Sequence, residues 1–540
     1  MRIFTRIGLL VAMLALAASV AGAQQRIAVV YNAGLAPAPL DGRVFLYIAK
    51  PTAVGVAPRF LISDHPGTQQ FFGVDVTAWR PGTPTVFDAH VLGYPLASLA
   101  GLPAGDYIVQ ALFNRYTVFH RADGHTVLLP ADAGEGQDMQ RKPGNLYSLP
   151  LHVHLDPRAP GTLRLTLSEA IPPLAPVPDT AWIKHLTIPS ALLTRFWGRP
   201  MYVSATVILP PGFARHPHAH YPVMIEQDHF THSMAPQFDR VRALWTAGKL
   251  PHFLWVDINH ANPYYDDSYA VNSANLGPYG DAIMQELIPA VERRFRGIGQ
   301  GWARFTYGCS TGGWEALADQ IFYPDEFNGA WGASPDPVDF RAFQIVNIYQ
   351  DPNAFWLQGP WSRLPRPDER RPDGSVTQTM ARDVRRELVL GTHGRSADQW
   401  DAWQAVFGPV GPDGYPAPIW DPATGVINHQ TAAYWKAHFD LDAWLIADWR
   451  TLAPKLDGKL HVYVGDMDSY YLNNAVYLMQ ALINSHDDPK ITASFTFGAR
   501  QPHCFDGTYG KESEEQLYMP QMLRRLRATA PAGADMSWEY

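Results

Sequence analysis

The sequence predicts two folded parts, an all-β domain followed by a larger α/β domain. Short β-rich segments separated by Gly, Pro and Asp fill residues 26–177, whereas strands alternate with helices after residue 179. A proline-rich stretch, residues 171–178, lies between the two patterns and is typical of a linker. With 540 residues, the chain is too long for one ordinary domain.

Residues 1–23 have the three parts of a secretory signal peptide. A basic start, Met1–Arg6, precedes a short apolar run, residues 7–20, and the small-residue exit Ala21–Ala23. A membrane anchor would need about 20 apolar residues, so anchoring is the weaker interpretation. We therefore expect a secreted or periplasmic protein without a membrane anchor.

Composition narrows the range of partners. The formal net charge of −8, the pI near 6.2 and the lack of a basic stripe argue against nucleic acid. The 17 Trp and the aromatic content of 12% suit either surfaces that stack on sugars and aromatic rings or a large aromatic core. The oligomeric state cannot be read from these features.

The first domain, residues 24–178, is expected to be a β-sandwich of immunoglobulin-like type. No amphipathic helix interrupts its strands, which alternate in part between apolar and polar residues. The expected strands are Arg43–Ile48, Asp106–Leu112, Leu146–Leu155 and Thr162–Leu167.

The α/β domain is expected in two pieces, residues 179–334 and 455–540, which form a largely parallel sheet with helices on both faces. Its expected strands include Met201–Leu209, Tyr221–Ile225, Phe253–Ile258, Phe327–Ala333, Leu460–Val464 and Ile491–Phe497, and its helices residues 280–295, 313–321 and 473–484. The intervening residues 335–454 are rich in Trp, Pro and Gly. We expect them to form a cap over the substrate pocket; the alternative is a structural elaboration without substrate contact.

The most informative motif is Gly308-Cys-Ser-Thr-Gly312, a G-x-S-x-G sequence between an expected strand and an expected helix. This context is typical of a nucleophile elbow, in which a strained turn exposes the serine at the carboxyl end of a strand. Ser310 is therefore the expected nucleophile, and the N–H of Thr311 an expected oxyanion donor. The alternative is an ordinary glycine-rich turn.

A serine nucleophile needs a base and a carboxylate that orients the base. In this class of fold both follow the serine along the chain, each just after a strand, and Asp468 and His503 have these positions. Asp466 is the rival acid, but the acid usually lies a few residues beyond the strand glycine, which favours Asp468.

The chain has two cysteines, and each is adjacent to a proposed reacting residue: Cys309 precedes Ser310, and Cys504 follows His503. If serine and histidine are in contact, their neighbours can reach the Cα separation of a disulfide, about 5.5 Å. In an exported chain we expect that bond to form. The alternative is two buried thiols.

Residues 184–505 resemble the putative-esterase branch of the α/β-hydrolases, which includes esterase-D and enterochelin-esterase relatives. The motifs that carry this resemblance are Tyr221-Pro-Val223, Glu286-Leu-Ile-Pro289, the serine turn, Tyr323–Ala330 and Gly465-x-x-Asp468. The Cys-Ser, Asp, His-Cys arrangement is also similar to that of the tannase and feruloyl esterase family. The resemblance implies an α/β-hydrolase fold and a serine esterase without a cofactor.

The chain departs from these relatives after the early strand, where they usually carry His-Gly and this sequence has Gln227-Asp-His-Phe230. The second oxyanion donor should come from this loop, and the N–H of Phe230 is our choice.

A histidine-rich region offers a rival zinc site, since imidazoles and a carboxylate can ligate zinc. Its members are His216, His218, His220, His229, His232, Asp257 and His260. No helical H-x-x-x-H spacing supports it, so we expect no metal.

These observations predict a secreted serine esterase for a small-molecule or carbohydrate-linked ester, with feruloyl, acetyl or related plant-polysaccharide and phenolic esters favoured. Hydrolysis of a siderophore ester or a peptide is the alternative reaction. An inactive hydrolase fold that binds carbohydrate is the alternative from a different class.

Overall fold

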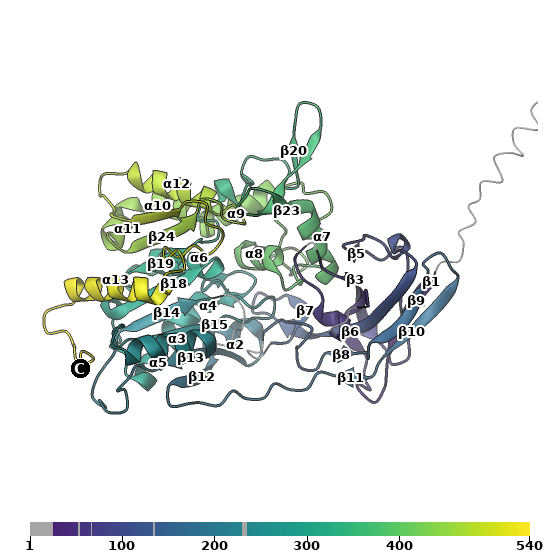
Figure 1. Cartoon of the computed structure of the whole chain (residues 1–540), viewed down its shortest axis with the longest axis horizontal. Helices are drawn as coiled ribbons and strands as arrows, with labels where there is room; N and C mark the ends of the chain where they lie inside the picture. The colour runs from purple at the N-terminus through teal and green to yellow at the C-terminus, as the bar shows by residue number, and fades with distance from the viewer. Residues whose placement is uncertain (1–24, 52–54, 66, 133–135, 229–234) are drawn as a thin grey trace, which may run out of the picture. The chain divides into compact units, whose positions relative to one another are not determined.

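The computed structural model describes residues 25–51, 55–65, 67–132, 136–228 and 235–540 (Figure 1). Within these ranges the chain forms two compact units. The first unit contains residues 25–63, 68–113 and 146–170, and the second contains residues 64–67, 114–145 and 171–540. The expected signal peptide lies outside the described residues.

The first unit consists of two β-sheets that share one hydrophobic core. One sheet has the order β10-β1-β4, with β1 and β10 parallel, and the other has the order β11-β8-β6-β2-β3-β5, with β9 also paired to β6. The strands are β1 (Gln25–Tyr31), β2 (Leu40–Ala49), β3 (Gln70–Trp79), β4 (Thr85–Phe87), β5 (Gly93–Tyr94), β6 (Gly105–His120), β8 (Leu146–Tyr147), β9 (Leu151–Leu155), β10 (Gly161–Leu167) and β11 (Glu169–Ala170). The immunoglobulin-like type of this sandwich stays a prediction.

The expected strand Leu146–Leu155 is interrupted, since β8 ends at Tyr147 and β9 begins at Leu151. The Ser148 hydroxyl accepts a hydrogen bond from the backbone N–H of Ala111 at 2.9 Å, in place of a regular ladder bond. Pro150 also has no N–H to donate. Sequence alternation alone does not show such a break.

The second unit is built on an eight-stranded sheet with the order β12-β13-β15-β14-β18-β19-β24-β25. The labels follow this order from β12 upward to β24 in Figure 1. The strands are β12 (Ile183–Ser190), β13 (Met201–Ile208), β14 (Val223–Gln227), β15 (Leu254–Asn259), β18 (Arg304–Cys309), β19 (Ala330–Ala333), β24 (Leu460–Gly465) and β25 (Ser494–Gly498). The pairs from β15 to β25 are parallel, and the β12–β13 and β13–β15 pairs are antiparallel. The largely parallel sheet agrees with the alternation of strands and helices in the sequence.

The helices of this unit are α2 (Ala191–Trp197), α3 (Ala235–Thr246), α4 (Tyr279–Ala282), α5 (Ile288–Phe295), α6 (Thr311–Phe322), α7 (Met380–Leu390), α8 (Gln399–Phe407), α9 (His429–His438), α10 (Leu441–Ala447), α11 (Trp449–Leu456), α12 (Asn473–Asn484) and α13 (Glu514–Thr529). The expected helix over residues 280–295 is divided by a π-helical turn, Ile283–Leu287. None of the helices in the described part of the chain combines the length and apolar character needed to cross a membrane.

A hairpin from the N-terminal half of the sequence belongs to the second unit. It is formed by the end of β6 and by β7 (Thr126–Pro130), paired from Tyr116 to His120. Its apolar side chains Phe119, Val127 and Leu129 are buried in the core of the second unit. The expected domain boundary at residue 178 therefore does not coincide with the packing of the chain.

The segment between β19 and β24 contains α7 to α11 and two short hairpins. The hairpins pair β20 (Trp356–Gln358) with β21 (Arg363–Pro365), and β22 (Pro367–Arg370) with β23 (Val376–Thr379). Four of its tryptophans are buried in contact with other aromatic rings: Trp400, Trp403, Trp420 and Trp435. The aromatic content of this segment therefore mainly builds a core, and Trp361 is the fully exposed exception, at 97%.

Candidate active site

Ser310 lies at a sharp turn between the end of β18 at Cys309 and the start of α6 at Thr311. Its backbone has φ 58° and ψ −122°, a conformation that is costly for a residue with a side chain. Backbone hydrogen bonds hold it there: the Ser310 N–H donates to the carbonyl of Ala333 at 2.9 Å, and its carbonyl accepts from Asp336 N at 3.1 Å. A non-glycine residue kept in such a conformation is what a nucleophile elbow requires.

The glycines around Ser310 are required by close backbone contacts. A Cβ on Gly308 would lie 2.4 Å from the carbonyl oxygen of Gln227, and one on Gly312 would lie 1.9 Å from the same atom. A Cβ on Gly313 would lie 2.7 Å from the carbonyl oxygen of Ala333. These distances are too short for any side chain, so the motif reflects the packing of α6 against β14 and β19.

His503 and Asp468 are in direct contact. Nδ1 of His503 lies 2.9 Å from Oδ2 of Asp468. Because a carboxylate can only accept, Nδ1 carries the proton and Nε2 is left as the basic nitrogen. The other carboxylate oxygen, Oδ1, accepts from the backbone N–H groups of Tyr470 at 3.0 Å and Leu472 at 3.2 Å.

This contact shifts the pKa of both groups. Burial lowers the pKa of His503, but the charge and hydrogen bond of Asp468 outweigh burial and raise it above 6.5. Burial raises the pKa of Asp468, but the charge and hydrogen bond of His503, with the two backbone donors, bring it below 3.8. The arrangement thus favours an ionised carboxylate beside an imidazole of raised basicity.

The rival acid, Asp466, has a different partner. Its Oδ1 accepts from the backbone N–H of Arg500 at 2.6 Å. The Arg370 guanidinium donates to the backbone carbonyls of Asp468 at 2.9 Å and Asp466 at 3.2 Å, and so holds the loop that carries both acids. Of the two carboxylates, Asp468 is the one in contact with His503.

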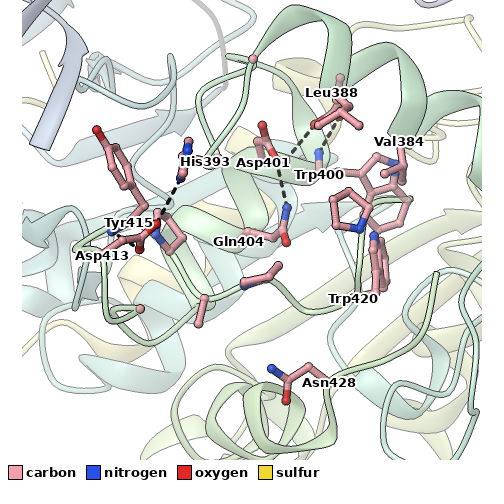
Figure 2. Close-up of a pocket in the computed structure, with 18 of the residues that line it drawn as sticks. Val384, Leu388, His393, Trp400, Asp401, Gln404, Asp413, Tyr415, Trp420 and Asn428 are labelled. Carbon is pink, nitrogen blue, oxygen red and sulfur yellow. Dashed lines mark hydrogen bonds and ion pairs between the residues drawn. The ribbon is translucent and has the colours of Figure 1, made fainter. Parts of the chain in front are cut away.

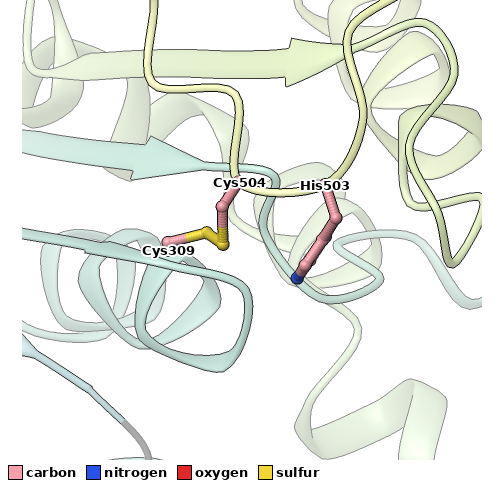
Figure 3. A group of neighbouring side chains, drawn as sticks. All are labelled: Cys309, His503 and Cys504. Atoms are coloured by element: carbon pink, nitrogen blue, oxygen red, sulfur yellow. A yellow bond between two sulfur atoms is a disulfide. The ribbon is translucent and has the colours of Figure 1, made fainter. Parts of the chain in front are cut away.

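Cys309 and Cys504 form a disulfide with a Cα separation of 5.6 Å, although 195 residues separate them in sequence (Figure 3). The bond joins the residue before Ser310 to the residue after His503. It therefore ties the loop after β25 to the end of β18. Figure 3 shows the ring of His503 beside this bond.

Ser310 and His503 line one cavity of about 330 Å³. The segment between β19 and β24, which we call the insertion, contributes the indole rings of Trp400 and Trp403, and the loop after β24 contributes Tyr470. The Tyr470 ring meets His503 edge-on, with ring centroids 4.9 Å apart. A cavity of this size accommodates a small ester.

Of the two expected oxyanion donors, Thr311 lies within the described residues and Phe230 does not. Thr311 is buried, and its hydroxyl donates to Oδ2 of Asp336 at 3.1 Å and lies 3.1 Å from the hydroxyl of Tyr269. Phe230 lies outside the described residues. Its N–H as second oxyanion donor stays a prediction.

Asp336 is a site residue that sequence reasoning missed. Its Oδ2 accepts from Tyr269 at 2.7 Å and from the indole of Trp403 at 3.1 Å, and the residue lines the cavity. Burial raises its pKa, against these hydrogen bonds and the charge of His503. Its place just after β19 was the available signal, since polar residues at the carboxyl ends of parallel strands face the site.

Of the rival metal residues that the structure describes, His216, His220 and His260 have different partners. The ring of His216 stacks on Tyr540 at 3.5 Å, and His220 contacts Asp535 at 2.9 Å. His260 instead lies in a buried group with Asp267 and Glu315. His229 and His232 lie outside the described residues.

A second, larger cavity of about 630 Å³ lies within the insertion and does not include Ser310 (Figure 2). Trp420, Tyr415 and several prolines line it. Trp400 lines both cavities and forms part of the wall of each.

Comparison with known proteins identifies the family of the region that contains Ser310. Residues 198–407 match the family model described as Putative esterase. No curated protein matches the chain.

Three solved structures illustrate the similarity. A ferulic acid esterase has 14% identity and a TM-score of 0.37, covering 64% of this chain and 99% of its own. An S-formylglutathione hydrolase from Agrobacterium tumefaciens has 12% identity and a TM-score of 0.36, covering 64% and 98%. A ferulic acid esterase from Anaeromyces mucronatus has 10% identity and a TM-score of 0.29, covering 64% and 95%. Residues 198–407, which contain Ser310, are thus similar to the putative-esterase family, and the chain is a serine carboxylic ester hydrolase.

Proposed function

We propose that this protein is an exported esterase that uses Ser310, His503 and Asp468 as a catalytic triad and forms an acyl-enzyme. Its favoured substrates are feruloyl, acetyl or related esters of plant polysaccharides and phenolic compounds. The export part of the proposal rests on residues 1–23, and the substrate part on the motifs shared with tannases and feruloyl esterases.

The reaction has two halves. Ser310 Oγ attacks the ester carbonyl while Nε2 of His503 takes the hydroxyl proton, and the tetrahedral intermediate expels the alcohol, which leaves with that proton. Water then attacks the acyl-serine, His503 removes its proton, and Ser310 regains a proton as the acid departs. Asp468 holds the imidazole in its tautomer and stabilises the imidazolium. The Thr311 N–H and a donor from the loop after β14, Phe230 in our choice, stabilise the oxyanion.

One observation carries the proposal: His503, whose Nδ1 lies 2.9 Å from Oδ2 of Asp468, lines the same cavity as Ser310, whose backbone has the conformation of a nucleophile elbow. A buried histidine–aspartate pair without a nucleophile would be only structural. The disulfide, which ties the residues next to Ser310 and His503 together, supports the same assignment.

The test is fluorophosphonate labelling of the full chain, with peptide mass spectrometry to locate the adduct. An activated serine gives one adduct, on Ser310, and Ser310→Ala gives none and loses at least about 10³-fold in rate on an acetyl ester. A folded sample that gives no adduct would contradict the proposal and favour a carbohydrate-binding protein.

The segment between β19 and β24 is proposed to act as the cap, because Trp400 and Trp403 line the cavity that contains Ser310. We also propose that the first unit is an immunoglobulin-like β-sandwich, and we assign it no ligand.

A further inference from the structure

The cavity that contains Ser310 is strongly acidic. Seven carboxyl side chains line it, against one guanidinium, that of Arg386, and the imidazole of His503. The proposed ester hydrolysis uses only Asp468, which lies behind His503 and is not among these seven. The mechanism therefore does not explain the excess of carboxyl groups in the cavity.

Four of these carboxyl groups lie near Tyr470: Asp64, Asp368, Glu369 and Asp383, which we call the acidic subsite. After burial, the charges of these four groups raise the pKa of Tyr470. Because the Tyr470 ring contacts His503, the acidic subsite is one side chain away from the catalytic base.

The single guanidinium of the cavity is already paired. Arg386 Nε lies 2.9 Å from Oδ1 of Asp383, and its NH1 contacts Asp398. In the described part of the chain, the Glu369 carboxylate accepts from the hydroxyl of Thr377 at 2.8 Å, and the Asp64 carboxylate lies 3.5 Å from the exposed imidazole of His65. Burial and the neighbouring charge of Asp383 raise the pKa of Asp368, so this carboxyl group favours its neutral form unless a further cation lies beside it.

Two buried acceptors of the cavity lack donors. Gln344 and Asp368 are 3% and 5% exposed, and their side chains hydrogen-bond to each other. Nevertheless, Oε1 of Gln344 and Oδ1 of Asp368 have no hydrogen-bond partner among the described residues. Buried acceptors without donors are costly, so a group that donates to both is missing from this part of the cavity.

A donor that also carries positive charge would favour the ionised form of these carboxyl groups. A metal ion does not fit the acidic subsite. Two groups of described residues bring three ligand atoms within 4.8 Å of one another, and neither contains a member of the acidic subsite. A primary ammonium offers three N–H donors and one positive charge, which suits an amide oxygen, a carboxylate oxygen and the acidic residues around them. A hydroxyl group could donate to an acceptor, but it would not balance the negative charge of an ionised carboxylate.

We propose that the ester cavity contains an ammonium subsite, and that the substrate is a carboxylic ester with a protonated primary amine on one side of the scissile bond. This inference rests on the proposed function, since it names the substrate of the same serine. Gln344 Oε1 and Asp368 Oδ1 accept from the ammonium, and Asp64 and Glu369 add long-range attraction.

The test compares matched esters on the full chain at pH 7. On the acyl side these are the 4-nitrophenyl esters of 6-aminohexanoate, 6-hydroxyhexanoate and heptanoate; on the alcohol side they are 2-aminoethyl, 2-hydroxyethyl and propyl ferulate. We expect the ammonium ester of at least one set to have a kcat/KM about tenfold or more above both partners, as charge-assisted hydrogen bonds require. That advantage should shrink as salt is raised.

Substitutions test whether the acidic subsite causes the preference for the ammonium ester. Asp368→Asn, which keeps the shape and removes the charge, should reduce the ratio of the ammonium ester to the neutral ester, whereas Asp239→Asn, on the exposed surface of α3, should leave the ratio as it is. Thermal unfolding of both variants checks their folding, and the wild-type ratios stand even if Asp368→Asn does not fold.

Equal rates for ammonium and neutral esters would overturn the ammonium subsite and leave the esterase standing. Equal rates for ammonium and hydroxyl esters would overturn the role of charge and assign the acceptors to hydroxyl groups. Absence of hydrolysis for every ester, without a fluorophosphonate adduct, would instead refute the proposed function itself.

Discussion

Asp468 and Asp466 are two residues apart, yet their different hydrogen-bond partners lead us to expect different effects on activity from the same substitution. Asp468→Asn should lower kcat/KM on an acetyl ester by about 10³-fold or more, because an amide no longer fixes the tautomer of His503 or stabilises its cation. Asp466→Asn keeps the Oδ1 that accepts from Arg500 and should remain within about twofold of wild type. A large loss for Asp466→Asn with none for Asp468→Asn would reverse the assignment.

The pKa of His503 gives a pH prediction at the same scale. The base must be neutral to accept the serine proton, so kcat/KM should fall as pH falls through the pKa of His503, which Asp468 raises above 6.5. Removing the negative charge with Asp468→Asn should move this limb to lower pH. The measurement is the pH profile of kcat/KM on a neutral ester, and an unmoved midpoint would contradict the coupling of the two groups.

The raised pKa of His503 makes the stability of the fold depend on pH in the opposite direction to the activity. A histidine with a raised pKa in the folded state stabilises the fold fully below its unfolded pKa, and this contribution is lost as pH rises through the folded value. Activity and this part of the stability therefore change in opposite directions across the same pH range above 6.5.

At the scale of elements, the disulfide connects the end of β18 to the loop that carries His503. Reduction should lower kcat severalfold, because the covalent link between the residues next to Ser310 and His503 is then lost. It should also destabilise the fold by about 2–5 kcal/mol, as expected for a bond that closes a long loop. The measurements are turnover and thermal unfolding after thiol counting has verified reduction, and unchanged turnover would refute the link to His503.

The order of strands and helices could largely be predicted from the sequence. Strand β24 and helix α12 lie where the periodicity placed them, because both are regular and flanked by turn residues. The break between β8 and β9 was missed because the Ser148 hydroxyl, instead of a backbone carbonyl, accepts the hydrogen bond from the N–H of Ala111. Antiparallel pairing of β12 and β13 was likewise not predicted, since alternation along one strand does not identify its neighbour.

At the scale of the whole molecule, the hairpin of β6 and β7 connects sequence from the N-terminal half to the core of the hydrolase unit. Phe119 packs on Trp197 with ring centroids 5.1 Å apart, and Arg395 donates to the carbonyl of Leu128 at 3.0 Å. A truncation at residue 178 would remove these contacts.

We therefore predict that Phe119→Ala destabilises the hydrolase unit by about 3–5 kcal/mol, the usual cost of deleting a buried ring. Val118→Ala is the matched control, because the neighbouring side chain on the same strand is 44% exposed and should cost no more than about 0.5 kcal/mol. Thermal unfolding followed together with esterase activity measures both. Similar losses for the two variants would show that the hairpin does not stabilise the unit.

The sequence by itself determined the class of this protein: the serine motif, the order of acid and histidine after it and the alternation of strands and helices identify an α/β serine esterase, because these features are local and chemically specific. Only the tertiary structure decided which residues share the cavity. Gln344 and Asp368 have no sequence signature, and the place of Asp336 after β19 is only a general one. These residues line the cavity with Ser310 because the sheet and the segment between β19 and β24 place them there. The excess of carboxyl groups and the two buried acceptors without donors in the described part of the chain, and with them the proposed ammonium subsite, arise only from this convergence in three dimensions.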